Sequence, residues 1–145
     1  PPGTGDIQLT LAQKIPVAGA VIVTTPQDIA TLDAKKALKM FQKVEVAVLG
    51  IIENMALHVC SKCGHEEHLF GEGGGQRMAA QYGVPLLGSL PLDISIREQG
   101  DAGRPVVVSA PDSSVAEAYR QAARALVEQL ELRPRASMSI ASSLV

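Results

Sequence analysis

Apolar positions along the chain fall into short runs that alternate with segments of helical periodicity. Two runs rich in Val and Ile, at residues 18–24 and 44–52, are bounded by turn or cap residues. Such runs are typical of buried strands. Between them, apolar side chains recur at helical spacing over residues 30–41. The order strand, helix, strand predicts a βαβ unit, and hence an α/β fold with a parallel sheet flanked by helices.

The helix between these strands has a start signal of its own. Thr25 is expected to be its N-cap, with Pro26 at the first helical position and Asp28 at the third. The hydroxyl can accept a free backbone N–H, and Pro has no N–H to leave unpaired. Lysines gather towards the other end of this helix, where the helix dipole favours cations.

Further elements are expected downstream. The pattern predicts a short helix at 76–82, a third short strand at 85–90, a turn of helix at 94–99 and a fourth strand at 106–108. The last helix has the clearest pattern. Ser114 and Glu117 are expected to form a capping box at its start, and its apolar face is expected to pack on the sheet.

Two segments lack periodicity. Residues 53–75 are rich in Cys, His, Glu and Gly, which predicts a long loop, and loops of this length in a compact domain are usually functional or mobile. Residues 133–145 are rich in Ser and have no periodic apolar face, so a disordered tail is expected there. The chain is therefore expected to form one domain over residues 1–132, followed by a tail over 133–145.

Composition narrows the choice of partners. A net charge of −2 and an aromatic content of 3% offer little to a phosphate backbone or to unstacked bases. The apolar runs are far shorter than the roughly 20 residues that a membrane span needs. Neither nucleic acid nor a membrane is expected as a partner. The chain has only 2 cysteines, close together, which favours a reducing, cytoplasmic setting over a disulfide framework.

Cys60 and Cys63 lie at a spacing that lets both sulfurs face one metal ion or cluster. A zinc knuckle, half of an iron–sulfur site, a redox dithiol and a pair of idle thiols are all compatible with this spacing. Zinc in a single chain would need His58, His65 or His68 as further ligands; otherwise these are expected to be solvated surface histidines. A cluster with four thiolate ligands would need the cysteine pairs of two copies, and so predicts a dimer.

Other polar and glycine-rich positions are less specific. The segment FGEGGG at 70–75 is followed by no Lys-Ser or Lys-Thr pair, so it is not a Walker A loop, and a flexible hinge before the next helix is expected instead. Asp6 is well placed as a plain helix N-cap. Asn54 follows the second strand and could serve as an ordinary loop residue.

Taken together, several segments resemble the Mrp/ApbC family of iron–sulfur cluster carriers, which are relatives of MinD among the deviant-Walker P-loop NTPases. They are, in chain order, PPGTGD at 1–6, TTPQ at 24–27, GIIENM at 50–55, CSKCG at 60–64, FGEGGG at 70–75, GVPLLGSLPLD at 83–93 and IREQGDAGRP at 96–105. The resemblance extends from residue 1 to about residue 130. It implies part of a MinD-like P-loop NTPase fold of the SIMIBI class.

The resemblance also implies what the cysteines bind. Cys60 and Cys63 match the family's cluster ligands, which bridge a [4Fe–4S] cluster between two subunits. The implied partners are a second copy of the chain, in a homodimer, and the apo iron–sulfur proteins that receive the cluster.

For the nucleotide, the resemblance implies ATP and Mg²⁺ in the full-length family. Asp6 matches the acidic switch residue that would sense the γ-phosphate or orient the attacking water, which is a catalytic role. Asn54 matches the asparagine that hydrogen-bonds adenine. Pro91 and Asp93 match the loop that closes over the adenosine.

The chain departs from the family pattern in one respect. In the family, the phosphate-binding loop and the Walker B aspartate precede the PPGTGD segment, and this sequence contains neither. The chain is thus expected to be the C-terminal part of a longer protein that by itself neither binds ATP tightly nor hydrolyses it. The missing strands are expected to leave an apolar sheet edge exposed and prone to association.

The main hypothesis is therefore an ATP-dependent iron–sulfur cluster carrier. An alternative from another class is a non-enzymatic zinc-knuckle interaction module, which predicts tightly bound zinc in a monomer. A third is a MinD-like partitioning ATPase without a metal. Such proteins usually carry an amphipathic membrane-targeting tail, and the serines between 137 and 143 break up any apolar face here.

Overall fold

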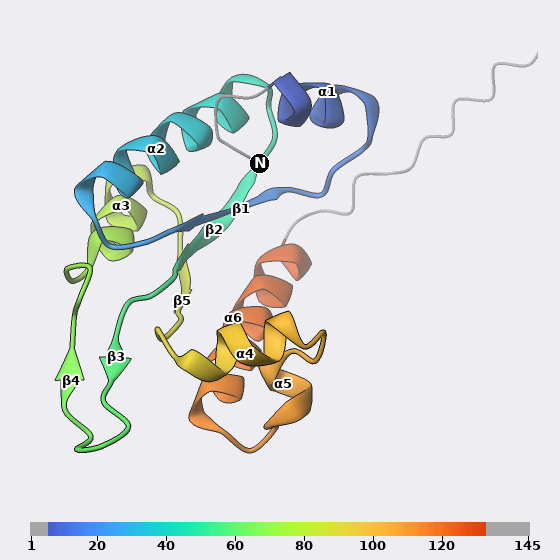
Figure 1. The fold of residues 1–145 in the computed structure, drawn as a ribbon. Helices are drawn as coiled ribbons and strands as arrows, with labels where there is room; N and C mark the ends of the chain where they lie inside the picture. The colour runs from blue at the N-terminus through green and yellow to red at the C-terminus, as the bar shows by residue number, and fades with distance from the viewer. Residues whose placement is uncertain (1–5, 133–145) are drawn as a thin grey trace, which may run out of the picture.

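A three-stranded parallel sheet lies at the centre of the computed structural model, which describes residues 6–132 (Figure 1). Its strands are β1 (Ala20–Thr24), β2 (Val48–Glu53) and β5 (Leu86–Ser89), in the spatial order β1-β2-β5. The helix α2 (Asp28–Lys43) connects β1 to β2. The βαβ unit and the parallel sheet expected from the sequence are confirmed. The expected tail at 133–145 lies outside the described residues.

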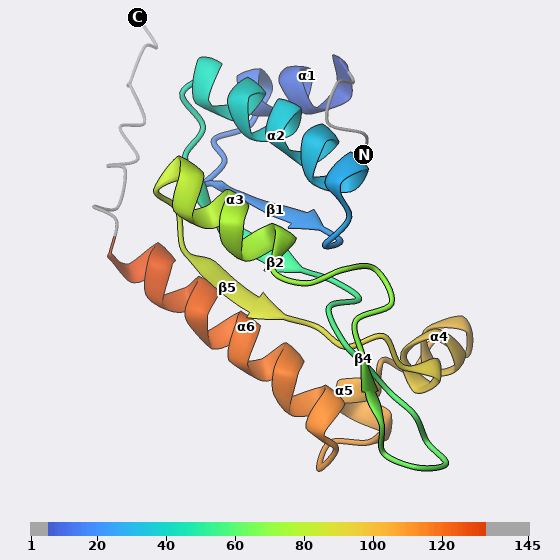
Figure 2. The ribbon, with the colours of Figure 1, turned by 90° about the vertical axis from the view of Figure 1, so that its left-hand side faces the viewer.

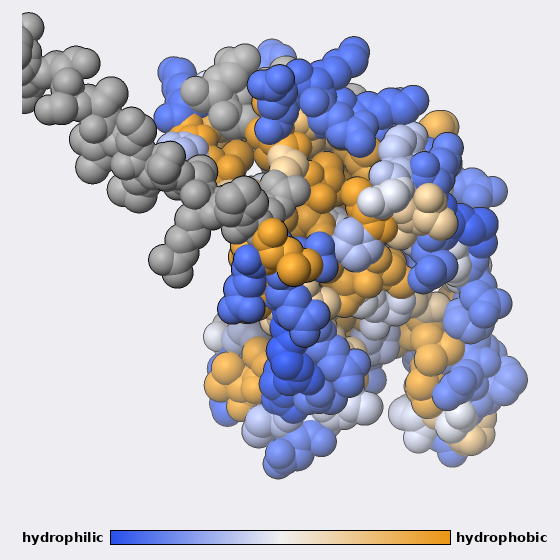
Figure 3. Space-filling model, turned by 180° about the vertical axis from the view of Figure 1, so that it is seen from behind, coloured by the Kyte–Doolittle hydropathy of each residue, from blue (hydrophilic) through white to orange (hydrophobic). Residues whose placement is uncertain are grey.

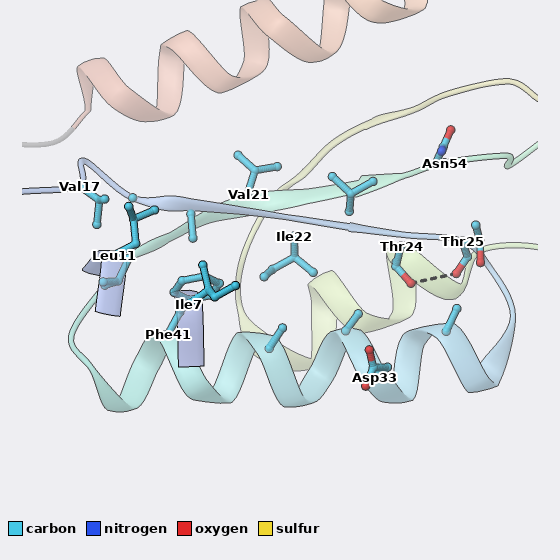
Figure 4. A pocket seen from close by; sticks show the side chains of 17 residues that line it. Ile7, Leu11, Val17, Val21, Ile22, Thr24, Thr25, Asp33, Phe41 and Asn54 are labelled. Carbon is cyan, nitrogen blue, oxygen red and sulfur yellow. Dashed lines mark hydrogen bonds between the residues drawn. The ribbon is translucent and has the colours of Figure 1, made fainter. Parts of the chain in front are cut away.

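Helices cover both faces of the sheet. α2 packs on β1, and α3 (Gly74–Tyr82) packs on β2. On the opposite face, α6 (Ser114–Glu131) runs along β5 and also contacts β2. Figure 4 shows the sheet between α6 and α2. The aliphatic core between the sheet and the helices α2 and α3 consists of Ile22, Ala34, Leu38, Ile51, Met78 and Ala79.

Smaller elements complete the fold. α1 (Asp6–Lys14) precedes β1, and α4 (Ile94–Asp101) follows β5. Within the expected loop, β3 (His58–Val59) and β4 (Glu66–Glu67) form an antiparallel hairpin, so the segment is more regular than its composition suggested. In Figure 2 this hairpin projects beyond the sheet. None of the helices within residues 6–132 is long and apolar enough to cross a membrane.

The start of α2 differs from the expectation. The helix begins at Asp28, its N-cap is Gln27, and no side chain caps it. Thr25 is therefore not the N-cap, because its hydroxyl is bonded to the side chain of Gln27 instead. Pro26 precedes the helix and is buried.

The cap of α6 lies one residue earlier than expected. Ser113 is the N-cap, and its hydroxyl accepts the backbone N–H of Ala116 at 3.1 Å. The expected capping box is not formed, because the carboxylate of Glu117 pairs with Arg120 and Arg124 rather than with the start of the helix. The guanidinium of Arg120, and then that of Arg124, lowers the pKa of Glu117.

The expected fourth strand is a helix. α5 (Val106–Ser109) is a single turn in which the N–H groups of Val108 and Ser109 donate to the carbonyl of Pro105, at 2.8 and 3.0 Å. Val106 is buried, while Val108 is 66% exposed. A short apolar run has the same pattern in a strand and in a buried helical turn. Here packing against α4 and α6 selects the turn.

The edge strand β1 borders an apolar groove of about 780 Å³ that is lined by α1, β1 and α2 (Figure 4). In Figure 4, Ile22 points towards α2, whereas Val21 points away from it. Val23 is 58% exposed on this edge. Figure 3 shows hydrophobic side chains gathered across the middle of one face of the molecule. The exposed apolar sheet edge expected from the sequence is present.

Candidate metal centre and nucleotide edge

The two cysteines lie in the turn of the β3–β4 hairpin. Backbone hydrogen bonds shape this turn. The N–H of Cys60 donates to the carbonyl of His65 at 2.9 Å, and the N–H of Gly64 donates to the carbonyl of Cys60 at 2.8 Å. Gly64 has a φ of 72°, in the left-handed region that favours glycine. The backbone therefore holds Cys60 and Cys63 on one short turn, as the spacing predicted.

The thiols of this turn are free and accessible. Cys60 is half-buried and Cys63 is exposed. The backbone N–H of Lys62, followed by the N–H and the thiol of Cys63, lowers the pKa of Cys60. These donors favour the thiolate, which is the form of cysteine that ligates metals. The turn is therefore suited to bind a metal ion or cluster from the solvent side.

The histidines of the segment do not complete a metal site. His58 and His68 each donate from Nδ1 to a backbone carbonyl, of Leu92 at 3.1 Å and of Ala56 at 2.8 Å. Both are thus engaged with the backbone, and only His65 is free of such a bond within the described chain. His65 and His68 are exposed, as expected of surface histidines, whereas His58 is half-buried. Over residues 6–132, no group of at least 3 His, Cys, Asp or Glu side chains could hold a metal ion.

The last two glycines of the glycine-rich segment are tightly packed. Gly74 and Gly75 are buried in the first turn of α3. A Cβ on Gly74 would lie 2.2 Å from the carbonyl oxygen of Pro26, and one on Gly75 would lie 2.9 Å from the Cβ of Glu53. Only residues without a Cβ allow α3 to begin this close to β1 and β2. Close packing therefore requires these two glycines. A Cβ on Gly71, earlier in the same segment, would meet nothing within 4 Å, so a hinge there stays a prediction.

Glu53 is a site residue that the sequence analysis missed. It is the last residue of β2, it is 5% exposed, and its Oε2 accepts the N–H of Gly75. This bond joins the two ends of the segment that carries the cysteines. The only sequence signal was an acidic residue closing an apolar strand, and its partner could not be inferred without the fold.

The expected adenosine contacts lie beyond the carboxyl ends of β2 and β5, which is where open parallel sheets bind ligands. The backbone N–H of Asn54 donates to the backbone carbonyl of Thr24 on the neighbouring strand, and the side-chain oxygen of Asn54 accepts the N–H of Met55. Asn54 also lines the groove beside β1. Pro91 is half-buried. Asp93 caps α4 by accepting the N–H of Ser95 at 2.8 Å.

Asp6 is placed apart from these residues. It is exposed and begins α1, and both Figure 1 and Figure 2 separate α1 from α4 along the length of the molecule. The structure therefore brings Asn54 and the 91–93 segment to one edge of the sheet, whereas α1, which Asp6 begins, borders the groove that Asn54 also lines.

Comparison with known proteins identifies the family. Residues 1–127 match the family described as ParA: NUBPL iron-transfer P-loop NTPase. The chain belongs to this family. The resemblance expected from the sequence segments is thereby confirmed.

Curated relatives carry the corresponding names. An iron–sulfur cluster carrier protein of Pseudomonas fragi is 64% identical over 123 residues, which are 85% of this chain and 43% of the relative. The iron–sulfur cluster transfer protein NUBPL of Mus musculus is 50% identical over 134 residues, which are 92% of this chain and 42% of the relative. The chain thus spans less than half the length of these relatives.

Solved structures agree on the fold. A nucleotide-binding protein from Archaeoglobus fulgidus, in complex with ADP, matches with a TM-score of 0.66 and 39% identity, over 81% of this chain and 47% of that one. The cell division ATPase MinD from Pyrococcus furiosus matches with a TM-score of 0.61 and 26% identity, over 77% of this chain and 43% of that one. The fold is part of a MinD-like P-loop NTPase.

Proposed function

We propose that this chain is the cluster-binding part of an ATP-dependent iron–sulfur cluster carrier. Cys60 and Cys63 from each of two subunits hold one [4Fe–4S] cluster as cargo. The observation that carries the proposal is the pair of free, accessible thiols on a turn whose backbone N–H groups favour the thiolate. Relatives that are 64% and 50% identical are named iron–sulfur cluster carrier and transfer proteins, which supports the same role.

Ligand number supports a homodimer. A [4Fe–4S] cluster is commonly held by four thiolates, and this chain has 2 cysteines. Within residues 6–132, no group of at least 3 His, Cys, Asp or Glu side chains is arranged to hold a metal ion. Two hairpins related by a two-fold axis would supply four thiolates through the same surface on both copies. The hairpin that carries the cysteines projects beyond the sheet (Figure 2), which is compatible with such a contact.

An exposed cluster suits delivery to apoproteins. A thiolate of the recipient forms a bond to iron while the bond from iron to Sγ of Cys60 breaks, and the released thiolate takes up a proton from water. Ligand exchange of this kind changes no oxidation state. The exposure of Cys63 gives a recipient direct access to the cluster. Two free thiols in a chain with only 2 cysteines also fit the reducing cytoplasm, which we propose as the location.

Nucleotide binding is proposed for the carboxyl edge of the sheet. The side-chain oxygen of Asn54 accepts the N–H of Met55, which leaves its amide N–H groups to donate to an adenine nitrogen. Pro91 and Asp93 would border the adenosine, and Asp6 would act as the switch acid. ATP with Mg²⁺ supplies the phosphoryl chemistry when bound. Tight phosphate binding requires a glycine-rich loop with Lys, which is not found in these 145 residues.

Anaerobic reconstitution with iron and sulfide tests the proposal. We expect a brown dimer with about four irons and four sulfides per pair of chains. A variant with Cys60→Ser and Cys63→Ser should take up neither. His65→Ala is the matched control, because it changes the same turn without removing a thiol, and it should leave cluster uptake unchanged. One tightly bound zinc per monomer, lost in His65→Ala, would overturn the carrier proposal in favour of a zinc knuckle.

A further inference from the structure

The segment that leads from β2 to the cysteines is paired with the segment that leads from β5 to α4. Residues 53–58 and 90–92 run side by side beyond the sheet proper. The backbone bonds between them are Leu90 N–H to Glu53 O at 2.8 Å, Ala56 N–H to Leu90 O at 3.0 Å and Leu92 N–H to Leu57 O at 2.8 Å. The parallel pairing thus continues to the base of the cysteine hairpin.

His58 closes this pairing with both its backbone and its side chain. It forms an isolated parallel bridge with Leu92. Its Nδ1–H also donates to the carbonyl of Leu92 at 3.1 Å, across 34 positions of sequence. His58 is the first residue of β3, and Cys60 follows directly after that strand. The side-chain bond therefore fixes the hairpin at its root.

The other end of the paired segment is fixed to α4. Asp93 caps that helix through both the N–H and the hydroxyl of Ser95. Pro91 restricts its own backbone, since its ring fixes φ. Residues 91–93 therefore connect the cap of α4 directly to Leu92, whose carbonyl accepts the Nδ1–H of His58.

We propose that His58 is a positioning residue that couples the 91–93 segment to the cysteine hairpin. A change at Asp93 alters the position of Cys60 through the bond between His58 and Leu92. Any effect of this coupling on the release of a cluster rests on the proposed function, but the coupling itself does not. Coupling through a network of packed and hydrogen-bonded groups has to be demonstrated by paired substitutions rather than by proximity.

His65 offers a matched control. It lies in the same hairpin, is 67% exposed at its side chain, and its nearest charged partner is Glu67 at 3.7 Å. Replacing either histidine by Phe keeps a ring and removes the N–H donor. Only in His58 does this donor bind the carbonyl of Leu92. His58→Asn keeps a donor and serves as the rescue variant.

The test uses the cluster-free chain and measures amide hydrogen exchange over residues 58–67 together with the alkylation rate of Cys60. Asp93→Ala, which releases the cap of α4, is made in each background. We expect it to speed hairpin exchange about fivefold in the parent chain and in His65→Phe, the scale of one hydrogen bond. It should have little effect in His58→Phe, whose hairpin is already released, and its effect should return in His58→Asn.

Two results would overturn the coupling. One is an unchanged hairpin when Asp93→Ala is made in the parent chain, and the other is an undiminished effect of Asp93→Ala in His58→Phe. If Phe prevents folding, as judged by circular dichroism, His58→Ala replaces it in the same comparison. Failure of the proposed function has a separate signature, because no variant would then take up a cluster while the exchange results stood as measured.

Discussion

At the scale of single residues, backbone N–H groups determine the chemistry of the cysteine turn. The N–H groups of Lys62 and Cys63 lower the pKa of Cys60, and burial and the nearby carboxylate of Glu67 oppose them with smaller effects. The backbone conformation of the turn therefore lowers the pKa of Cys60, and the reactivity of this thiol should depend on the turn being folded.

The pH dependence of Cys60 alkylation tests this directly. A lowered pKa means that the thiolate of Cys60 is populated at lower pH in the folded chain than in the unfolded chain. We expect the midpoint of its reaction with iodoacetamide, followed by mass spectrometry, to lie at lower pH in buffer than in denaturant. A midpoint at equal or higher pH in the folded chain would contradict the geometry of the turn.

Gly74→Ala should destabilise the fold. Its Cβ would lie 2.2 Å from the carbonyl oxygen of Pro26, and neither backbone segment can shift freely. We expect a loss of about 3 kcal/mol in the free energy of unfolding, measured with urea.

Gly100→Ala is the control for this prediction. Gly100 lies in α4, and its Cβ would meet nothing within 4 Å. We expect it to be neutral or to gain up to about 1 kcal/mol from helix propensity. Equal losses for the two substitutions would show that the close approach of α3 to Pro26 is unimportant.

At the scale of elements, long segments with a regular pattern were predictable from the sequence. The strands β1 and β2 and the helices α2 and α6 were each expected within a few residues of their bounds. Short segments were not. Residues 106–108 form a helical turn because they pack against α4 and α6. The starts of α2 and α6 differ from the prediction because the expected capping groups, the hydroxyl of Thr25 and the carboxylate of Glu117, bind other side chains.

The candidate site was predictable to a similar extent. Cys60, Cys63 and the 91–93 segment were identified from local spacing and resemblance. The bonds from Glu53 to Gly75 and from His58 to Leu92 join residues 22 and 34 positions apart. No local pattern encodes such pairs, because the fold alone brings them together.

Ser113→Ala tests the observed cap of α6. Its hydroxyl accepts the N–H of Ala116, so its removal should lower the free energy of unfolding by about 1 kcal/mol. Ser114→Ala, at the position that the sequence pattern favoured, should change stability by less than about 0.5 kcal/mol. Urea unfolding of both variants measures these losses. A larger loss in the free energy of unfolding for Ser114→Ala would favour the capping box that the sequence predicted.

At the scale of the whole molecule, the sheet ends in an open apolar edge. Parallel sheets are ordinarily covered on both faces. We therefore expect copies of the chain to associate through the groove beside β1, which has a volume of about 780 Å³.

Val23→Lys should reduce association of the cluster-free chain. Val23 is 58% exposed on the edge strand, and a lysine there opposes edge-to-edge pairing. Ile94→Lys is the control, since Ile94 is 66% exposed on α4, outside the groove. Sedimentation velocity should show fewer oligomers for Val23→Lys only. An equal reduction by both would indicate a general effect of charge.

The central claim is that two copies of this chain share one cluster through Cys60 and Cys63. Native mass spectrometry of the anaerobically reconstituted chain tests it most directly. We predict a species with the mass of two chains plus one [4Fe–4S] cluster, which is lost when both cysteines are replaced by serine. A single chain that retains one zinc ion, or a cluster-bearing dimer that survives the double substitution, would contradict the claim.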